Sequence, residues 1–290
     1  MSIGRVILRI LGIVVVVVLG ATLAAATYVY VVSERVIHRQ YDAPLDDLAV
    51  PTDSASIAEG ERLARIRGCP GCHGAALEGK VQFDNFLGGR EVAANLTAVA
   101  RHYTTAELVR VIRYGVRPNG EGVMDMPSPM YYHLSDSDLG KIIAYLRSLP
   151  RAEGNPYEFS PGPRVRWEIA RGEWVPWPED IQLMGPRMVS PALDDTLRYG
   201  EYLARTVCSE CHGIDLLGWW GNPPLTVAGA YPDTSFFRLM RTGVPIGGRD
   251  LELMDDVARS RFSHFTDDEI RSLHAYLRTL TAVGIASEEG

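Results

Sequence analysis

The hydrophobic pattern of the chain begins with an unbroken apolar stretch, Ile10 to Val32, which contains no charged residue. As an α-helix this stretch would be about 35 Å long, enough to cross the hydrocarbon core of a bilayer. Tyr28 and Tyr30 lie near its end, where aromatic side chains favour the membrane surface. A cleavable signal peptide is the alternative, but the stretch is longer than the apolar core of a signal sequence. We therefore predict an uncleaved membrane anchor in residues 1–33, followed by an extended tether in residues 34–53.

Apolar positions in the rest of the chain follow the period of an α-helix. Two stripes with this spacing are formed by Leu139, Ile142, Ile143, Leu146 and Leu149, and by Ile270, Leu273, Leu277 and Leu280. The alternation that is typical of a strand occurs only at Val165, Trp167 and Ile169. We therefore predict an all-α fold.

Polar residues mark where these helices should begin and end. Ser135 with Asp138, and Thr266 with Glu269, have the spacing of an N-terminal capping signal before each stripe. Thr104 with Glu107 predicts a further helix start, and Gly115 is placed to end that helix.

The helical pattern occurs twice, at offsets of 128 to 140 residues. The matching segments are 60–65 with 200–205, 113–116 with 241–244, and 144–149 with 275–280. Two copies are too few for a solenoid, so we predict tandem compact domains in residues 54–150 and 194–290.

The segment between the two repeats, residues 151–193, has a different composition. Seven of the chain's prolines and Trp167, Trp174 and Trp177 lie in it. Prolines at this density exclude a long helix, whereas tryptophans bury large apolar areas. We predict a linker strap that packs across both domains. The alternative is a linker that contacts a partner subunit.

Overall composition is that of a globular protein, with 46% hydrophobic residues and a net charge of −7. There is no basic run of the kind that binds nucleic acid, so a nucleic-acid partner is excluded. Residues 194–290 contain nine Arg against 15 Asp and Glu. An acidic second domain should associate with a basic surface on a partner, more weakly at high salt.

All four cysteines lie in two pentapeptides of the form C-x-x-C-H, residues 69–73 and 208–212. This motif is typical of covalent c-type haem attachment. Two thiols three positions apart can each bond one vinyl group along a haem edge, and the adjacent histidine can bind the iron. A zinc site would need further ligands nearby, and a thioredoxin-like redox pair would need a βαβ context. Neither is present in the sequence, so we predict two haem c groups held by Cys69, Cys72, Cys208 and Cys211.

Each repeat resembles a class I cytochrome c domain, and the chain as a whole resembles a membrane-anchored dihaem cytochrome c. The first repeat is also similar to cytochrome subunits of membrane-bound alcohol and aldehyde dehydrogenases. The resemblance implies that the first and last helices of each domain cross closely, with Gly60 against Tyr145 and Gly200 against Tyr276. It also implies attachment of haem outside the cytoplasm. We therefore expect a bacterial inner-membrane protein with a cytoplasmic N-terminus and periplasmic haem domains.

The axial ligands decide whether such a protein carries electrons or binds a substrate at iron. The resemblance implies His73 and His212 on one side of each haem, and a methionine from the loop before the last helix on the other. Met126 is our choice in the first domain, with Met124 as its rival, and Met254 is our choice in the second. Proline follows Met126 as in the family, whereas Asp255 follows Met254. Pairs that use His133 and His264 are the alternative.

These ligands predict an electron carrier without catalytic residues of its own, either free or as a subunit of a membrane complex. Its redox partners would be membrane or periplasmic proteins. The alternatives are a dihaem peroxidase-like enzyme, which would need one open iron, and a redox or gas sensor.

Overall fold

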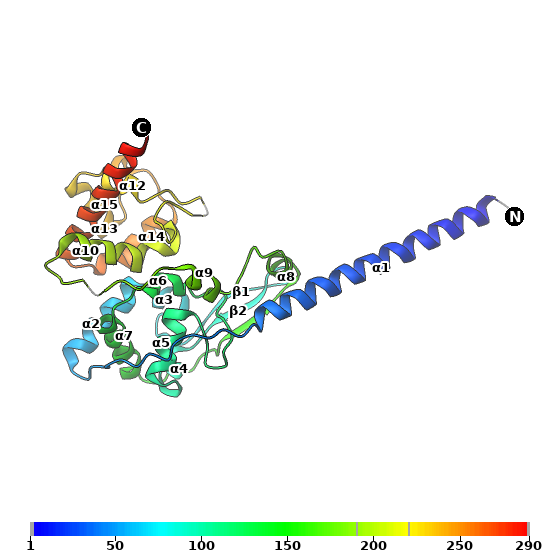
Figure 1. Ribbon diagram of the computed structural model, residues 1–290, viewed down its shortest axis with the longest axis horizontal. Helices are drawn as coiled ribbons and strands as arrows, with labels where there is room; N and C mark the ends of the chain where they lie inside the picture. The colour runs from blue at the N-terminus through cyan, green and yellow to red at the C-terminus, as the bar shows by residue number, and fades with distance from the viewer. Residues whose placement is uncertain (1–2, 190, 220, 289–290) are drawn as a thin grey trace.

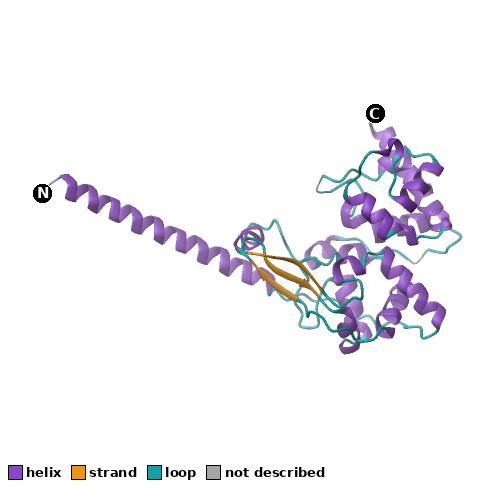
Figure 2. Cartoon of the chain, turned by 180° about the vertical axis from the view of Figure 1, so that it is seen from behind, coloured by secondary structure: helices purple, strands orange, loops and turns teal. Residues whose placement is uncertain are grey.

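The computed structural model describes residues 3–189, 191–219 and 221–288, with side chains up to Ala282 in the last helix. Residues 1–2, 190, 220 and 289–290 fall within the predicted anchor, linker and second domain, and lie outside the described residues. Helices dominate the chain, which forms a two-part head at the end of one long helix (Figures 1 and 2).

The long helix, α1 (Ile3–Ile37), extends away from the head as a single rod (Figure 1). Its most apolar 18-residue window has a mean hydropathy of 2.8 and no buried residues, so the helix is long and apolar enough to cross a membrane. The helix continues beyond the predicted anchor, because its last turns are packed against the head. Ser33 and Ile37 are buried there.

The first four residues of the predicted tether belong to α1, and residues 38–53 are extended and contact the head at several points. Gln40 forms a bridge with Glu121, and the Tyr41 amide donates to the Gly120 carbonyl at 2.9 Å. Further along, Leu48 and Val50 are packed on the main hydrophobic core.

The first half of the head consists of short helices around one apolar centre. They are α2 (Ser54–Ile66), α3 (Cys69–His73), α4 (Leu96–His102), α5 (Thr105–Tyr114), α6 (Ser128–Tyr132) and α7 (Asp136–Ser148). The predicted capping signals are confirmed. Thr104 and Glu107 form a capping box, Gly115 ends α5 in the left-handed conformation, and Ser135 caps α7.

The second half also consists of short helices and turns, followed by a longer last helix. It contains α10 (Thr196–Leu203), the π-helical turn η1 (Ala204–Cys208), α11 (Ser209–His212), α12 (Thr226–Gly229), α13 (Asp233–Thr242), the 3₁₀ turn η2 (Ile246–Gly248), α14 (Leu253–Ser260), the 3₁₀ turn η3 (Phe262–His264) and α15 (Asp267–Glu288). The predicted start of the last helix is confirmed, since Thr266 and Glu269 exchange hydrogen bonds.

Both halves contain the close helix crossing that was expected at two glycines. A Cβ atom on Gly60 of α2 would lie 1.9 Å from the Lys141 carbonyl oxygen of α7 and 3.1 Å from the Tyr145 Cβ. A Cβ atom on Gly200 of α10 would lie 2.0 Å from the Ser272 carbonyl oxygen of α15 and 2.8 Å from the Tyr276 Cβ. Only glycine allows backbones to approach so closely.

The prediction of a wholly helical fold was wrong in one region. Three antiparallel strands form a sheet in the order β1 (Lys80–Asn85), β2 (Gly89–Ala93) and β3 (Glu158–Pro161). The alternation at Val165, Trp167 and Ile169 was also misinterpreted, since these residues lie in helix α8 (Pro163–Ala170). Val165 and Ile169 are one helical turn apart and both are buried, whereas Trp167 on the opposite face is exposed.

The segment between the two halves contacts both of them. The Trp174 indole donates to the Met124 carbonyl at 3.0 Å, and the Trp177 ring meets the Trp219 ring edge-on, 6.3 Å between centroids. After α9 (Pro178–Leu183), Arg187 donates to the carbonyls of Tyr132 and Leu134.

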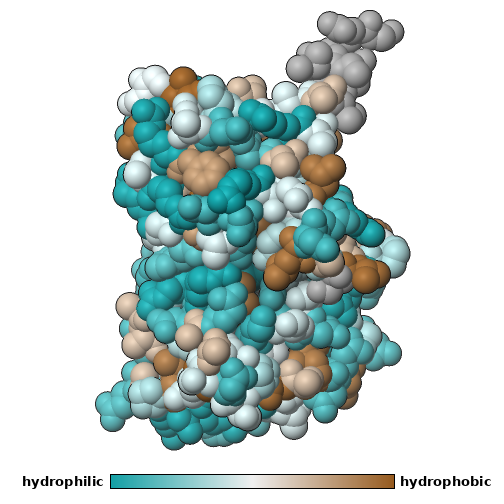
Figure 3. Space-filling model, turned by 90° about the vertical axis from the view of Figure 1, so that its left-hand side faces the viewer, coloured by the Kyte–Doolittle hydropathy of each residue, from teal (hydrophilic) through white to brown (hydrophobic). Residues whose placement is uncertain are grey.

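One continuous hydrophobic core joins the halves, with Leu63 and Leu139 from the first and Phe236 and Leu273 from the second. The outer face in Figure 3 is largely hydrophilic, with scattered hydrophobic residues. The two halves therefore share one core and are not packed as two independent domains.

Candidate haem-binding sites

The first C-x-x-C-H motif forms the short helix α3, which follows Gly68 in the left-handed conformation. Cys69, Cys72 and His73 line a cavity of about 2520 Å³. Apolar side chains from α4, α5, α6 and α7 line its interior, among them Val99, Leu108, Met130 and Leu139. This volume exceeds that of an ordinary small-molecule pocket, so a planar group of the size of haem can be enclosed.

His73 is held in one orientation by the backbone. Its Nδ1 lies 2.7 Å from the Ala94 carbonyl oxygen, to which it can donate a hydrogen bond. Burial lowers the pKa of the His73 imidazole, because the charged form is disfavoured away from water. A neutral ring whose Nδ1 is engaged presents Nε2 as a lone-pair donor, the form in which histidine binds a metal.

The second motif has the same arrangement. Nδ1 of His212 lies 2.7 Å from the Pro223 carbonyl oxygen, and burial lowers the pKa of this imidazole too. The loops that follow the two histidines also agree in detail. The Gly79 amide donates to the His73 carbonyl and the Gly218 amide to the His212 carbonyl, both at 2.8 Å.

Sequence reasoning missed these loops. Leu77 and Leu216 both have positive φ angles, of 59° and 65°, which are uncommon for a branched residue. The shared signal was present as His-Gly-x-x-Leu-x-Gly after each pair of cysteines. The two carbonyl acceptors had no such signal, because any residue supplies a backbone carbonyl.

No disulfide joins the four cysteines, all of which lie among the described residues. Burial raises the pKa of Cys69 to about 11 and that of Cys208 to about 12, and it also raises the pKa values of Cys72 and Cys211. Among the described residues, no group of three or more His, Cys, Asp and Glu is placed to hold a bare metal ion. Two thiols spaced for thioether bonds beside an oriented histidine fit haem c.

Three methionines of the first half line the cavity, namely Met124, Met126 and Met130. Met124 is fully buried and packs with Ile37 and Val165 in a small cluster at the end of α1. Met130 is buried in the main core, whereas Met126 is only partly buried at its edge. Met126 is therefore the methionine that the core leaves most free to reach a group in the cavity.

Two other predicted ligands, Met254 and His133, are not among the residues that line the large cavity. Met254 lies in the first turn of α14, partly buried against the main core, and does not line the large cavity. In the bis-histidine alternative, His133 accepts a hydrogen bond from the Met188 amide at 3.1 Å and is also outside the cavity lining. Burial lowers the pKa of His133 to about 4.

An ion pair lies between the two cysteine motifs. Arg261 donates to Glu210, which is inside the second motif, at 2.6 Å. The same guanidinium lies against the first motif, since a Cβ atom on Gly68 would be 2.2 Å from the Arg261 Cζ. Glu210 and Arg261 also line the large cavity, so the two attachment turns approach each other across this pair.

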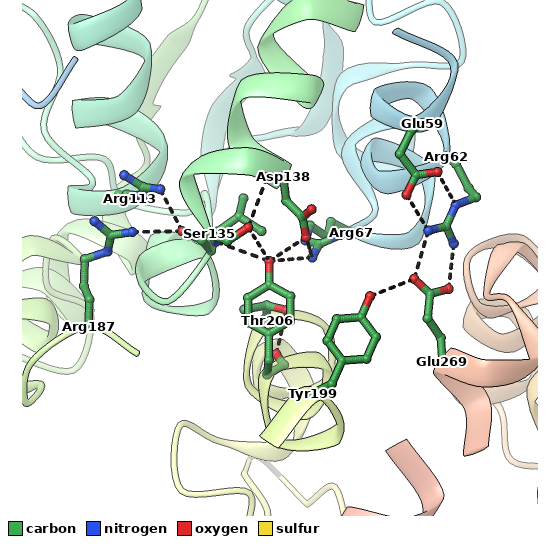
Figure 4. A network of polar contacts seen from close by, with 12 residues as sticks. Glu59, Arg62, Arg67, Arg113, Ser135, Asp138, Arg187, Tyr199, Thr206 and Glu269 are labelled. Atoms are coloured by element: carbon green, nitrogen blue, oxygen red, sulfur yellow. Dashed lines mark hydrogen bonds and ion pairs between the residues drawn. The ribbon is translucent and has the colours of Figure 1, made fainter. Parts of the chain in front are cut away.

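Polar contacts also join α2 and α7 of the first half to α10 and α15 of the second (Figure 4). The Tyr202 hydroxyl of the second half donates to Asp138 of the first at 2.6 Å. Arg62 of the first half donates to both carboxylate oxygens of Glu269 in the second, at 2.7 and 2.8 Å (Figure 4). Such paired hydrogen bonds fix the relative orientation of the elements that carry them.

Comparison with known proteins agrees with this geometry. Residues 57–150 match the family model of cytochrome c. The chain is 26% identical to the cytochrome c subunit of a quinone-dependent alcohol dehydrogenase from Gluconobacter oxydans, over 91% of this chain and 61% of the relative. It is 24% identical to the corresponding subunit from Gluconacetobacter polyoxogenes, over 80% of this chain and 57% of the relative.

A further relative is the fructose dehydrogenase cytochrome subunit of Gluconobacter japonicus, which is 23% identical over 82% of this chain and 55% of the relative. The chain spans about three-fifths of the length of the curated relatives that it matches. Residues 57–150 are thus a cytochrome c domain, in a chain that is similar to the cytochrome subunits of dehydrogenases.

Proposed function

We propose that the chain is a membrane-anchored dihaem cytochrome c that transfers electrons as the cytochrome subunit of a dehydrogenase complex. The observation that carries this proposal is the duplicated arrangement after each cysteine pair. Two histidines at equivalent positions each have Nδ1 2.7 Å from a backbone carbonyl oxygen, and the same loop hydrogen bond follows each of them. The family match covers only the first of these sites, so the second rests on this internal likeness.

Haem c supplies a one-electron couple at its iron when it is bound. Cys69 and Cys72 would fix the first group covalently, and Cys208 and Cys211 the second. His73 and His212 would each hold Nε2 towards an iron, with the Nδ1 hydrogen bond keeping the ring in place. Met126 and Met254 would be the second protein ligands of the two groups. A thioether ligand would favour the ferrous state, and an iron with two protein ligands would leave no position for substrate.

Electrons would pass between the two sites where the two C-x-x-C-H turns, residues 69–73 and 208–212, approach each other. The Arg261–Glu210 pair lies between them, 2.6 Å from nitrogen to oxygen, with both side chains largely buried. A fixed separation between two redox groups suits electron transfer. The contacts of Tyr202 and Glu269 hold the two halves in one orientation.

The anchor sets the location of the protein. We infer that α1 crosses the bacterial inner membrane with its N-terminus in the cytoplasm, so that the head lies in the periplasm. The relatives are subunits of dehydrogenases, which supports a dehydrogenase subunit as electron donor. The acidic second half would dock on a basic surface of a redox partner.

Haem content tests the proposal directly. The full chain, expressed with a haem-attachment system, should have an intact mass that includes two haem groups. The double variant Cys69→Ala/Cys72→Ala and the double variant Cys208→Ala/Cys211→Ala should each retain one haem. His38→Ala, outside both sites, serves as the control and should retain two. A parent protein with one haem would overturn the dihaem proposal.

Carbon monoxide distinguishes the carrier from the peroxidase-like alternative. If both irons are closed by strong ligands, the reduced visible spectrum should not change when the gas is added. A change in about half of the haem would mean an open iron, and peroxide turnover would then have to be measured. The relatives described above are cytochrome subunits, so they give the peroxidase-like alternative no support.

A further inference from the structure

A small structural layer attaches the head to α1. It consists of α8 and the loop between β1 and β2, which are joined by hydrogen bonds from the Gly162 amide to the Gly88 carbonyl and from the Arg164 amide to the Leu87 carbonyl. On its inner side, Val165 and Ile169 of α8 pack with Ile37 of α1. The layer is thus a firm part of the head and not a free loop.

The outer side of this layer exposes large apolar side chains. Phe86 is 85% exposed, Leu87 56% and Trp167 51%. Trp167 lies on the opposite face of α8 from Val165 and Ile169, so it is directed away from the core of the head. We call these three residues the juxtamembrane patch. The segments that carry them are neighbours, since the Leu87 carbonyl accepts from the Arg164 amide, three residues before Trp167. Exposed apolar groups on neighbouring segments commonly mark an interaction site.

Contacts with α1 give the height of the layer relative to the membrane. The Arg166 guanidinium of α8 lies over the Tyr30 ring, 4.5 Å from its centroid, and donates to the Ser33 hydroxyl at 2.9 Å. Tyr30 is within the last turn of the charge-free stretch, and Ser33 directly follows that stretch. The layer is therefore level with the point where the apolar part of α1 ends.

The overall arrangement agrees with this placement. In Figure 1, α8 lies at the edge of the head that is nearest to the apolar part of α1, and Figure 2 shows the same from behind. Aromatic side chains at this level would meet the region of lipid headgroups, which is where Trp and Tyr are enriched in membrane proteins.

We propose that the juxtamembrane patch inserts into the interfacial region of the bilayer that α1 crosses. The patch would be a second point of attachment, and it would fix the tilt and rotation of the head relative to the membrane plane. The inference rests on the proposed role of α1 as an anchor, but not on the number of haem groups.

Site-specific photo-crosslinking of the full chain in native membranes tests this inference. A diazirine-bearing amino acid replaces Leu87 in one variant, Trp167 in a second and Val227 in a control. Val227 lies in α12 of the second half and is 50% exposed, which matches the patch residues. After irradiation, mass spectrometry identifies what each position has bonded.

Positions 87 and 167 should give phospholipid adducts in several-fold higher yield than position 227. Equal and low lipid yields at all three positions would overturn the inference, and so would crosslinks from the patch to a protein subunit. Extraction of the same membranes with alkaline carbonate tests the anchor separately. A chain that remains in the membrane without lipid adducts refutes the patch alone, whereas a chain that is released refutes the anchor and the patch together.

Discussion

Single hydrogen bonds orient the residues of each predicted haem site. The Ala94 carbonyl, as the acceptor for His73 Nδ1, selects both the tautomer and the ring orientation of this histidine. The cysteine and histidine positions could be predicted from sequence because they form a contiguous motif. The methionine ligand could not be decided in this way, because Met124 and Met126 are only two residues apart and differ chiefly in what they pack against.

The packing of these two methionines leads to a prediction about the axial ligand. Met126→Leu should lower the midpoint potential of one haem and open its iron to carbon monoxide, because leucine cannot donate a lone pair. Met124→Leu, which keeps a side chain of similar volume in the cluster with Ile37, should do neither. Potentiometry and carbon monoxide difference spectra of both variants provide the measurement. The opposite pattern would assign the ligand to Met124.

The close crossing at Gly60 predicts a stability effect. Gly60→Ala would place a methyl group 1.9 Å from the Lys141 carbonyl oxygen, so α2 and α7 must separate. We expect a loss of ~1–3 kcal/mol or more in the free energy of unfolding. Gly185→Ala is the matched control, because a Cβ atom there has no neighbour within 4 Å. Thermal unfolding of both variants should show a lower midpoint only for Gly60→Ala.

At the scale of elements, the accuracy of sequence analysis depended on how local the determinants are. The helices that begin at Thr105, Asp136 and Asp267 were predictable, because each carries its own cap. The sheet was not, since β3 is only four residues long and pairs with β2 from more than 60 residues away. Its register is supported by Arg90, which donates to Glu158 across the pair at 3.0 Å.

The contact between α2 and α15 predicts a dependence of stability on pH. Burial alone would raise the pKa of Glu269, but hydrogen bonds from Arg62 and Thr266 outweigh it and hold this pKa below the ordinary value of 4.5. A carboxylate with a lowered pKa stabilises the fold fully above its unfolded pKa, and this stabilisation is lost as the pH falls through the folded value.

Glu269→Gln should therefore be less stable than the parent at neutral pH and should lose less further stability on acidification below about pH 4.5. Chemical denaturation at a series of pH values measures this. Asp268→Asn removes the neighbouring carboxylate, which is 89% exposed, and is the control that should follow the parent curve. Parallel curves for Glu269→Gln and the parent would contradict the assigned role of the ion pair.

At the scale of the whole molecule, the two halves behave as one body, because they share a single hydrophobic core and are joined by the Arg62–Glu269 ion pair and the Tyr202–Asp138 hydrogen bond. Arg261 has a central position, since it reaches from the second half to the glycine before the first cysteine motif. The repeats in the sequence predicted two similar units. They did not indicate that both attachment turns would face a common interface, because that depends on long-range packing.

Loss of the Arg261 side-chain charge should weaken this interface. Arg261→Gln leaves Glu210 partly buried without its partner, and we expect a loss of ~1–2 kcal/mol in stability. Arg259→Gln breaks the Arg259–Asp256 pair, whose side chains are 52% and 76% exposed, and should change stability by less than about 0.5 kcal/mol. Hydrogen exchange should show faster opening of residues 68–73 and 208–212 in Arg261→Gln only.

The segment that follows α1 determines how the protein can meet its partners. Residues 38–53 run along the head, where Tyr41 donates to Glu179, Tyr114 donates to Asp46, and Leu48 and Val50 pack against the main core. A cytochrome on a flexible linker could move between a donor and an acceptor several nanometres apart. This head is instead held in a fixed position on α1, so its redox partners must approach it. Under the proposed function, donor and acceptor would both have to dock on the head where it is held, so turnover would not depend on how fast the head diffuses.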